Sequence, residues 1–126
     1  MHIAQFEHHR KKILYVDDDP SVLKVTRDLL EHKGYQVETA GTGQRAVEQI
    51  CKQFDLIIVD YNLPDFNGDV VAERFKLQQP SVPILMVTGD GGLPDHALDN
   101  VNGFLMKGSG FALLFGAISE LTETVQ

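Results

Sequence analysis

Several short apolar runs in this 126-residue sequence end at side chains that can bind ions or phosphate. The runs and their end residues are 13–16 with Asp17 and Asp18, 56–59 with Asp60, 82–87 with Thr88, and 104–106 with Lys107. Carboxylates crowded into one cleft cannot all stay ionised unless a cation lies between them. Mg²⁺ meets this need before Ca²⁺ on grounds of cavity size. Together with a lysine and a hydroxyl, such a set is suited to holding the anionic oxygens of a phosphoryl group.

These side chains meet only if the chain alternates strands with helices. Hydrophobic periodicity predicts strands over 13–16, 35–39, 56–59, 82–87 and 104–106, and helices over 20–33, 44–53, 69–79, 95–100 and 110–124. This order predicts a parallel sheet with helices on both faces, joined by right-handed crossovers. Ligands of such sheets bind outside the carboxyl ends of the strands. The residues named above as able to bind ions or phosphate are all predicted to lie at that edge.

Local signals predict where the helices begin and end. Pro20 suits the first helical position because it lacks an N–H that would be unpaired there, and Asp19 before it is expected to be an N-cap rather than a metal ligand. Gly34 stands where a left-handed residue ends a helix. Ser109 is expected to cap the last helix. The fourth helix is expected to be short, because the segment from 89 to 103 is rich in glycine.

Composition excludes several classes of protein. The single cysteine, Cys51, cannot form an intramolecular disulfide and leaves too few thiols for a usual zinc cluster, which favours a cytoplasmic location. The net charge of −7 argues against nucleic-acid binding, which needs a basic face. The apolar runs are far shorter than the roughly 20 residues needed to span a bilayer. We therefore expect one globular domain without nucleic-acid or membrane partners.

Taken together, four motifs in this order resemble those of response-regulator receiver domains from two-component phosphorelay signalling. The motifs are Ile-Leu-Tyr-Val-Asp-Asp-Asp-Pro at 13–20, Asp-Leu-Ile-Ile-Val-Asp-Tyr-Asn-Leu-Pro-Asp-Phe-Asn-Gly at 55–68, Val-Pro-Ile-Leu-Met-Val-Thr-Gly at 82–89 and Gly-Phe-Leu-Met-Lys at 103–107. The resemblance runs from about Lys12 to Thr124. It implies a flavodoxin-like (βα)5 three-layer α/β sandwich with strand order 2-1-3-4-5, a tail over 1–12 and a receiver domain over 13–126.

The resemblance also implies a role for each site residue. Asp60 would accept a phosphoryl group. Mg²⁺ would be held by Asp17, Asp18, Asp60 and the backbone carbonyl of Asn62. Lys107 would pair with the phosphoryl oxygens, and Thr88 would hydrogen-bond them in the modified state. In this family an aromatic side chain turns inward when the hydroxyl residue moves, and the matching position here is Phe104.

The partners that the resemblance implies are proteins. The phosphoryl donor would be a sensor histidine kinase or a histidine phosphotransfer protein, and an unknown downstream protein would receive the signal. The domain would catalyse only its own phosphorylation and dephosphorylation. A homodimer through the face formed by the fourth helix, the fifth strand and the fifth helix is left open.

The sequence departs from the family in the region that normally carries the signalling change. Gly108 replaces the proline that usually follows the lysine, often after a cis peptide bond, and the segment between Thr88 and Lys107 is short and glycine-rich. Two alternatives therefore remain. One is a receiver fold kept as a docking module without phosphorylation. The other is a haloacid-dehalogenase-like phosphatase, whose nucleophile motif has the spacing found at residues 17–21, although this would leave Asp60 and Lys107 unexplained.

Overall fold

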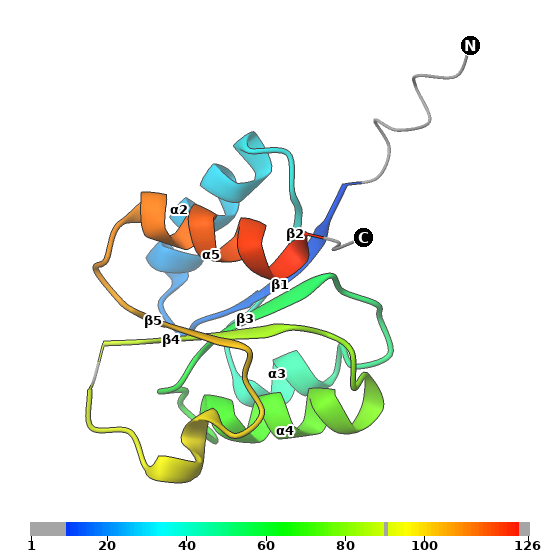
Figure 1. Ribbon diagram of the computed structural model, residues 1–126, viewed down its shortest axis with the longest axis vertical. Helices are drawn as coiled ribbons and strands as arrows, with labels where there is room; N and C mark the ends of the chain where they lie inside the picture. The colour runs from blue at the N-terminus through cyan, green and yellow to red at the C-terminus, as the bar shows by residue number, and fades with distance from the viewer. Residues whose placement is uncertain (1–9, 90, 124–126) are drawn as a thin grey trace.

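A five-stranded parallel sheet forms the middle layer of the protein, as the computed structural model shows for residues 10–89 and 91–123 (Figure 1). The strands are β1 (Lys12–Val16), β2 (Gln36–Ala40), β3 (Leu56–Asp60), β4 (Ile84–Thr88) and β5 (Gly103–Met106). Their order across the sheet is β2-β1-β3-β4-β5, and every neighbouring pair is parallel. The predicted fold class and strand order are thus confirmed.

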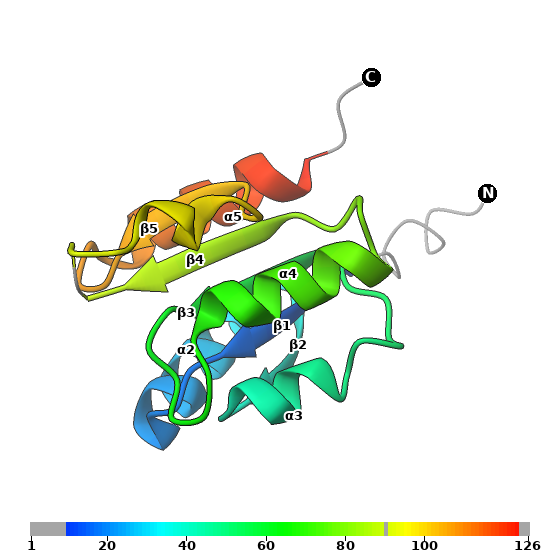
Figure 2. The same ribbon diagram turned by 90° about the horizontal axis from the view of Figure 1, so that it is seen from below.

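Helices cover both faces of this sheet (Figures 1 and 2). The helices α2 (Pro20–His32) and α5 (Phe111–Thr122) lie on one face, and α3 (Gly43–Val47) and α4 (Gly68–Gln78) lie on the other. A 3₁₀ turn, η1 (Asp95–Leu98), precedes β5. Of the helices in the described part of the chain, none is long and apolar enough to cross a membrane.

Strand periodicity divides the core into two clusters, because successive side chains point to opposite faces of the sheet. Leu14, Val16, Ile57 and Val59 belong to the cluster under α3 and α4, together with Phe75. The cluster under α2 and α5 is built from the alternate positions: Ile13, Tyr15, Leu56, Ile58, Leu85, Leu114 and Ile118. All five residues of β3 are buried, as the continuous apolar run predicted for a strand covered on both faces.

The predicted ends of α2 are confirmed, whereas the predicted cap of α5 is wrong. Asp19 Oδ1 accepts the backbone N–H groups of Ser21 and Val22 at 2.9 and 3.3 Å, and Gly34 has a φ of +102°. The cap position of α5 is Gly110, without a side-chain cap hydrogen bond. Ser109 instead donates its hydroxyl to the carbonyl of Met106 at 2.6 Å, because the turn out of β5 brings that carbonyl within reach.

Helix lengths and faces differ from the sequence pattern in places. The helix expected over 44–53 is helical only from 43 to 47 and continues as turns. Two apolar residues at helically spaced positions are exposed: Val25 in α2 (51%) and Phe111 in α5 (43%). In α2 the buried positions are Thr26 and Leu30. Single-sequence periodicity does not fix the exact side of a helix that meets the sheet, and packing decided it here.

The β5 edge of the sheet is thinly covered. β5 has one neighbour, β4, and only the short η1 lies in the place of the fourth helix (Figure 2). Phe104 and Met106, which alternate with Leu105 along the strand, are 41% and 40% exposed. The expectation of a short fourth helix is confirmed, and its consequence is an exposed apolar strip on β5.

Candidate functional site

The predicted site residues converge at the carboxyl edge of the sheet. Asp17 directly follows β1, Asp60 ends β3, Thr88 ends β4, and Lys107 directly follows β5. Asp17, Asp60 and Thr88 are nearly inaccessible, with 1%, 4% and 0% of their surface exposed. Parallel pairing of β1 with β3 and of β3 with β4 brings these strand ends together. Residues far apart in sequence therefore form one polar cluster.

Lys107 joins the two buried carboxylates. Its Nζ lies 2.6 Å from Asp60 Oδ2 and 3.2 Å from Asp17 Oδ2. The lysine side chain is 36% exposed, so its stem reaches inward from the surface to the acidic groups. Charge-assisted hydrogen bonds of this length are stronger than neutral ones. One ammonium nevertheless balances only one of the two negative charges.

The carboxylates have unused capacity for a cation. Oxygens of Asp17, Asp18 and Asp60 lie within 4.8 Å of one another, and Asp18 is exposed to solvent. Asp17 Oδ1 accepts the backbone N–H of Asp19 at 3.0 Å, but buried Asp17 Oδ2 has no hydrogen bond of good geometry. Three hard oxygen donors, one of them met only by the ion pair with Lys107, fit a divalent cation such as Mg²⁺. The donor set is therefore compatible with the predicted metal.

The electrostatics of the pair reflect this imbalance. Burial raises the pKa of Asp60 above its ordinary value, and the hydrogen bonds from Lys107 and the Asn62 N–H offset this only in part. Burial alone would lower the pKa of Lys107, but the hydrogen bond and charge of Asp60, with a further contribution from Asp17, raise it. The pKa of Asp60 is thus raised mainly by burial, whereas the pKa of Lys107 is raised by the carboxylates that contact it, which keeps the lysine protonated.

Backbone contacts fix Asp60 in place. Its Oδ1 accepts the Asn62 N–H at 3.1 Å, and the Gly68 N–H donates to the Tyr61 carbonyl at 2.7 Å, which closes the loop between β3 and α4. A Cβ at Gly68 would stand 2.2 Å from the Asp60 carbonyl oxygen. Glycine is therefore required for α4 to begin directly against the end of β3. The metal-binding role of the Asn62 carbonyl stays a prediction.

Thr88 and Phe104 share one face of the sheet. Phe104 is paired with Met86 across β4 and β5, and Met86, two residues before Thr88, faces the α3 and α4 side. The Lys107 N–H donates to the Thr88 carbonyl at 2.8 Å, so the backbones that carry the hydroxyl and the lysine are joined directly. The partial exposure of Phe104 corresponds to an outward position. Its movement stays a prediction.

The backbone conformation at Gly108 explains why this position is not the proline that the family usually has. Its φ is +84°, which proline cannot adopt because its ring holds φ near −65°. No cis peptide bond occurs among the described residues, so Lys107 is joined to Gly108 by a trans bond. The lysine is aimed by its ion pairs and by the contact with Thr88 rather than by a rigid proline.

Two residues near the site were not predicted from the sequence. Tyr15 lies on β1 two residues before Asp17, and burial raises the pKa of its phenol. Asp65 accepts the N–H groups of Gly43 and Gln44, each at 2.8 Å, and so ties the start of α3 to the loop after β3. The sequence alone could have placed Tyr15 on the same face as Asp17, because side chains alternate along a strand. The Asp65 contact joins residues about twenty positions apart, so no local pattern predicts it.

Comparison with known proteins identifies the family. The response regulator receiver domain family matches residues 13–119. The chain therefore belongs to the response-regulator receiver domains of two-component signalling, which are signalling modules rather than ordinary enzymes. This membership decides against the phosphatase alternative, and Asp19 of its motif serves here as the cap of α2.

The relatives agree with this assignment. The chain is 30% identical over 120 residues to the transcriptional regulatory protein GlrR of Escherichia coli, covering 92% of this chain and 27% of GlrR. A receiver domain from Methanospirillum hungatei superposes with a TM-score of 0.84 at 33% identity, over 88% of this chain and 92% of that one. The response regulator TrrA of Thermotoga maritima, solved in complex with Mg²⁺ and BeF, gives 0.83 at 26% identity, over 88% and 98%.

Proposed function

We propose that the chain accepts a phosphoryl group on Asp60 in a Mg²⁺-dependent reaction. The observation that carries this proposal is the pair of buried carboxylates, Asp17 and Asp60, that share the ammonium of Lys107. Asp60 Oδ2 contacts the lysine, while Oδ1 is held by the Asn62 N–H. A carboxylate fixed in this way, beside a cation and a lysine, is suited to act as a nucleophile toward phosphorus.

The reaction would move one phosphoryl group without a change in oxidation state. A carboxylate oxygen of Asp60 forms a bond to phosphorus as the phosphorus–nitrogen bond of a phosphohistidine breaks, and the histidine nitrogen keeps the electron pair. When bound by Asp17, Asp18, Asp60 and the Asn62 carbonyl, Mg²⁺ would neutralise charge on the transferring group. Lys107 would exchange part of its contact with Asp60 for the phosphoryl oxygens, and Thr88 would donate its hydroxyl to them.

The donor we propose is a sensor histidine kinase or a histidine phosphotransfer protein, and the output is a change of surface near Phe104. The chain spans only 27% of the length of GlrR. We therefore do not assign to this chain the activity or the DNA partners of full-length transcriptional regulators. The thin cover over β5 supports a movable Phe104, because little packing opposes a rotation of the ring. A cytoplasmic location and the tail over 1–12 also remain proposals, and residues 1–9 lie outside the described part.

The direct test of the acceptor is intact-protein mass spectrometry after incubation with acetyl phosphate and Mg²⁺. The wild type should gain about 80 Da, the mass of one phosphoryl group. Asp60→Asn should show no such gain. Asp28→Asn, which removes an exposed carboxylate from α2, is the matched control and should gain the same mass as the wild type. Equal labelling of Asp60→Asn and the wild type would remove Asp60 from the proposal.

A second test separates a phosphorylated receiver from a docking module. Mg²⁺ at 100 times its dissociation constant should raise the free energy of unfolding by about 2.7 kcal/mol, and Asp17→Asn should abolish this gain. Beryllofluoride added to the Mg²⁺ form should then change the NMR signals around Phe104. Metal binding without any such spectral change would favour docking without phosphorylation.

A further inference from the structure

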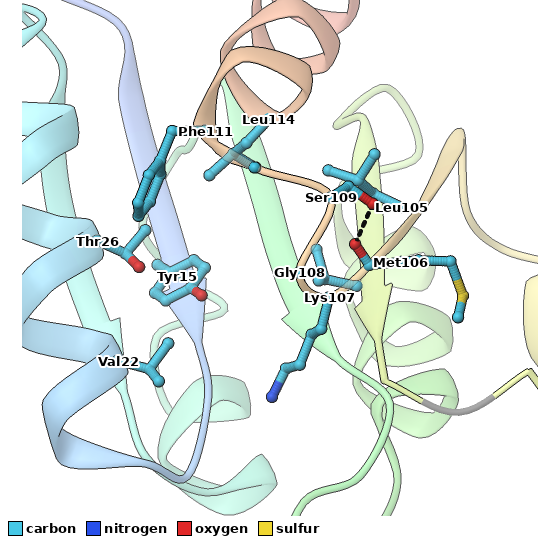
Figure 3. Close-up of a pocket in the computed structure, with 12 residues that line it drawn as sticks. Tyr15, Val22, Thr26, Leu105, Met106, Lys107, Gly108, Ser109, Phe111 and Leu114 are labelled. Atoms are coloured by element: carbon cyan, nitrogen blue, oxygen red, sulfur yellow. Dashed lines mark hydrogen bonds between the residues drawn. The ribbon is translucent and has the colours of Figure 1, made fainter.

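A cavity of about 390 Å³ lies beside the carboxylate site, between α2 and the connection from β5 to α5 (Figure 3). Its lining includes Tyr15, Val22, Thr26, Leu105, Phe111 and Leu114, and the stem of Lys107 stands at one side. Small-molecule sites in proteins commonly have volumes of about 300–1,000 Å³ and mostly apolar walls with a few polar groups. The cavity has this size and this composition.

The residues between β5 and α5 leave the cavity unfilled. Gly108 and Gly110 have positive φ values of +84° and +96°, and a Cβ at either position would find no atom within 4 Å. Ser109 between them turns its hydroxyl back to the Met106 carbonyl at 2.6 Å (Figure 3). After Lys107, the connection therefore borders the cavity mostly with backbone and contributes no large side chain to fill it.

The walls of the cavity select for a neutral ligand. None of the described residues that line it is acidic, so a cation would find no partner there. The one cation among these lining residues, Lys107, already contacts Asp60 and Asp17, so an anion would find no free positive charge there. The rings of Tyr15 and Phe111 offer aromatic contact, and the hydroxyls of Tyr15 and Thr26, which interact with each other, can each still accept a hydrogen bond from a ligand.

We propose that this cavity binds a neutral aromatic molecule of one or two fused rings that carries a single hydrogen-bonding group. The ring would pack among Val22, Leu105 and Leu114, and its polar group would face the hydroxyl of Thr26. A flat aromatic body is favoured over a flexible aliphatic one because it loses less rotational freedom on binding.

Occupancy of the cavity is coupled to the carboxylate site through Lys107, and this part rests on the proposed function. The same side chain borders the cavity and contacts Asp60, so a ligand packed against its stem changes the freedom of its amine. Coupling between two sites is reciprocal. A bound ligand should therefore change the rate of phosphorylation by acetyl phosphate.

The binding test uses 2-naphthol as the probe and the full chain, without any phosphoryl donor. Methyl and amide NMR spectra should show saturable shifts, with a dissociation constant below about 1 mM. Intermolecular nuclear Overhauser effects should reach the methyl groups of Leu105 and Leu114. Two charged analogues, 2-naphthoate and naphthylmethylammonium, should bind at least several-fold more weakly than 2-naphthol.

A pair of substitutions on one helix locates the ligand. Val22→Phe puts a ring into the cavity and should abolish binding, whereas Val25→Phe places the same ring on the exposed face of α2 and should leave binding unchanged. Thr26→Val keeps the side-chain shape but removes the hydroxyl, and should weaken binding by up to about tenfold.

Several results would overturn the site. Absence of saturable 2-naphthol binding, Overhauser effects to a different region, or tighter binding of a charged analogue would each do so, and none depends on whether Val22→Phe folds. An unchanged phosphorylation rate at saturating 2-naphthol would overturn the coupling alone. Because binding is measured without phosphorylation, its failure is distinct from failure of the acceptor role of Asp60.

Discussion

The middle of the sheet is more tightly packed than its β5 edge. β1 and β3 are flanked by strands on both sides, and Asp17 and Asp60 at their ends are 1% and 4% exposed. β5 has one neighbouring strand, and its Phe104 and Met106 are 41% and 40% exposed. The half that holds the proposed acceptor is thus close-packed, whereas the half proposed to transmit the signal is only partly covered.

This difference suits the two tasks that we propose. Phosphoryl transfer depends on alignment to a fraction of an ångström, which a buried strand end supplies. A surface change needs a segment whose alternative positions differ little in free energy, and such segments have few buried apolar contacts. The thin cover of β5 and the glycines after Lys107 provide that freedom without loosening the carboxylates.

The largest expected contrast is between apolar truncations in the two regions. Ile58→Ala in β3 removes a side chain with no exposed surface, so it should lower the free energy of unfolding by about 2–5 kcal/mol. Phe104→Ala in β5 should cost less than about 1 kcal/mol because the ring is already partly in solvent. Urea unfolding measures both. Similar losses for the two variants would contradict the contrast in packing.

A second prediction concerns the close approach of Gly68 to the end of β3. Gly68→Ala forces a methyl group against the Asp60 carbonyl and should destabilise the fold by about 1–3 kcal/mol and slow phosphorylation. Gly116→Ala in α5 is the matched control, since a Cβ there meets nothing within 4 Å, and it should stabilise by about 0.5–1 kcal/mol. Opposite signs are expected in thermal unfolding, and a neutral Gly68→Ala would show that the loop yields easily.

The loop after Lys107 gives a third, smaller effect. Gly108→Ala meets no steric obstacle but must hold a φ of +84°, which costs about 1–2 kcal/mol for an L-residue. Gly89→Ala, at a position without positive φ and with only ordinary contacts, should change stability little. Chemical denaturation compares them. A Gly108→Ala variant as stable as the wild type would mean that this loop readily takes another conformation.

The smallest effect is expected at β2, the opposite edge, which carries ion pairs instead of an exposed apolar strip. Glu38 lies 2.7 Å from Lys52 Nζ and 3.4 Å from Lys12 Nζ. The hydrogen bond from Lys52, together with Lys12 and against a small effect of burial, lowers the pKa of Glu38. Glu38→Gln should therefore cost under about 1 kcal/mol at pH 7.

The sign of the pH dependence at Glu38 follows from its lowered pKa. The stabilisation is fully present above the unfolded pKa of about 4.3 and is lost as the pH falls through the lower folded value. Unfolding of the wild type and Glu38→Gln from pH 7 down to pH 3 should converge at the acidic end. A difference that grows on acidification would contradict the ion-pair origin, as would one that does not shrink at high salt.

Much of the site followed from local sequence. Asp17, Asp60, Thr88 and Lys107 stand at the ends of apolar runs, and parallel topology requires those ends to share one edge. The N-cap at Asp19 was predictable because it depends on neighbouring residues only. The cap assigned to Ser109 failed because a nearby carbonyl in the turn offered the hydroxyl a better partner.

The sequence by itself determined the order of strands and helices, the two faces of each strand and the residues gathered at the carboxyl edge, because these depend on periodicity and on interactions within a few residues. Only the tertiary structure decided that Lys107 lies between Asp60 and Asp17, that Phe104 is partly exposed, and that a cavity opens beside Tyr15. The Lys107–Asp60 contact joins positions 47 apart in sequence. Distances and voids of this kind arise from how whole elements pack, which no local pattern encodes.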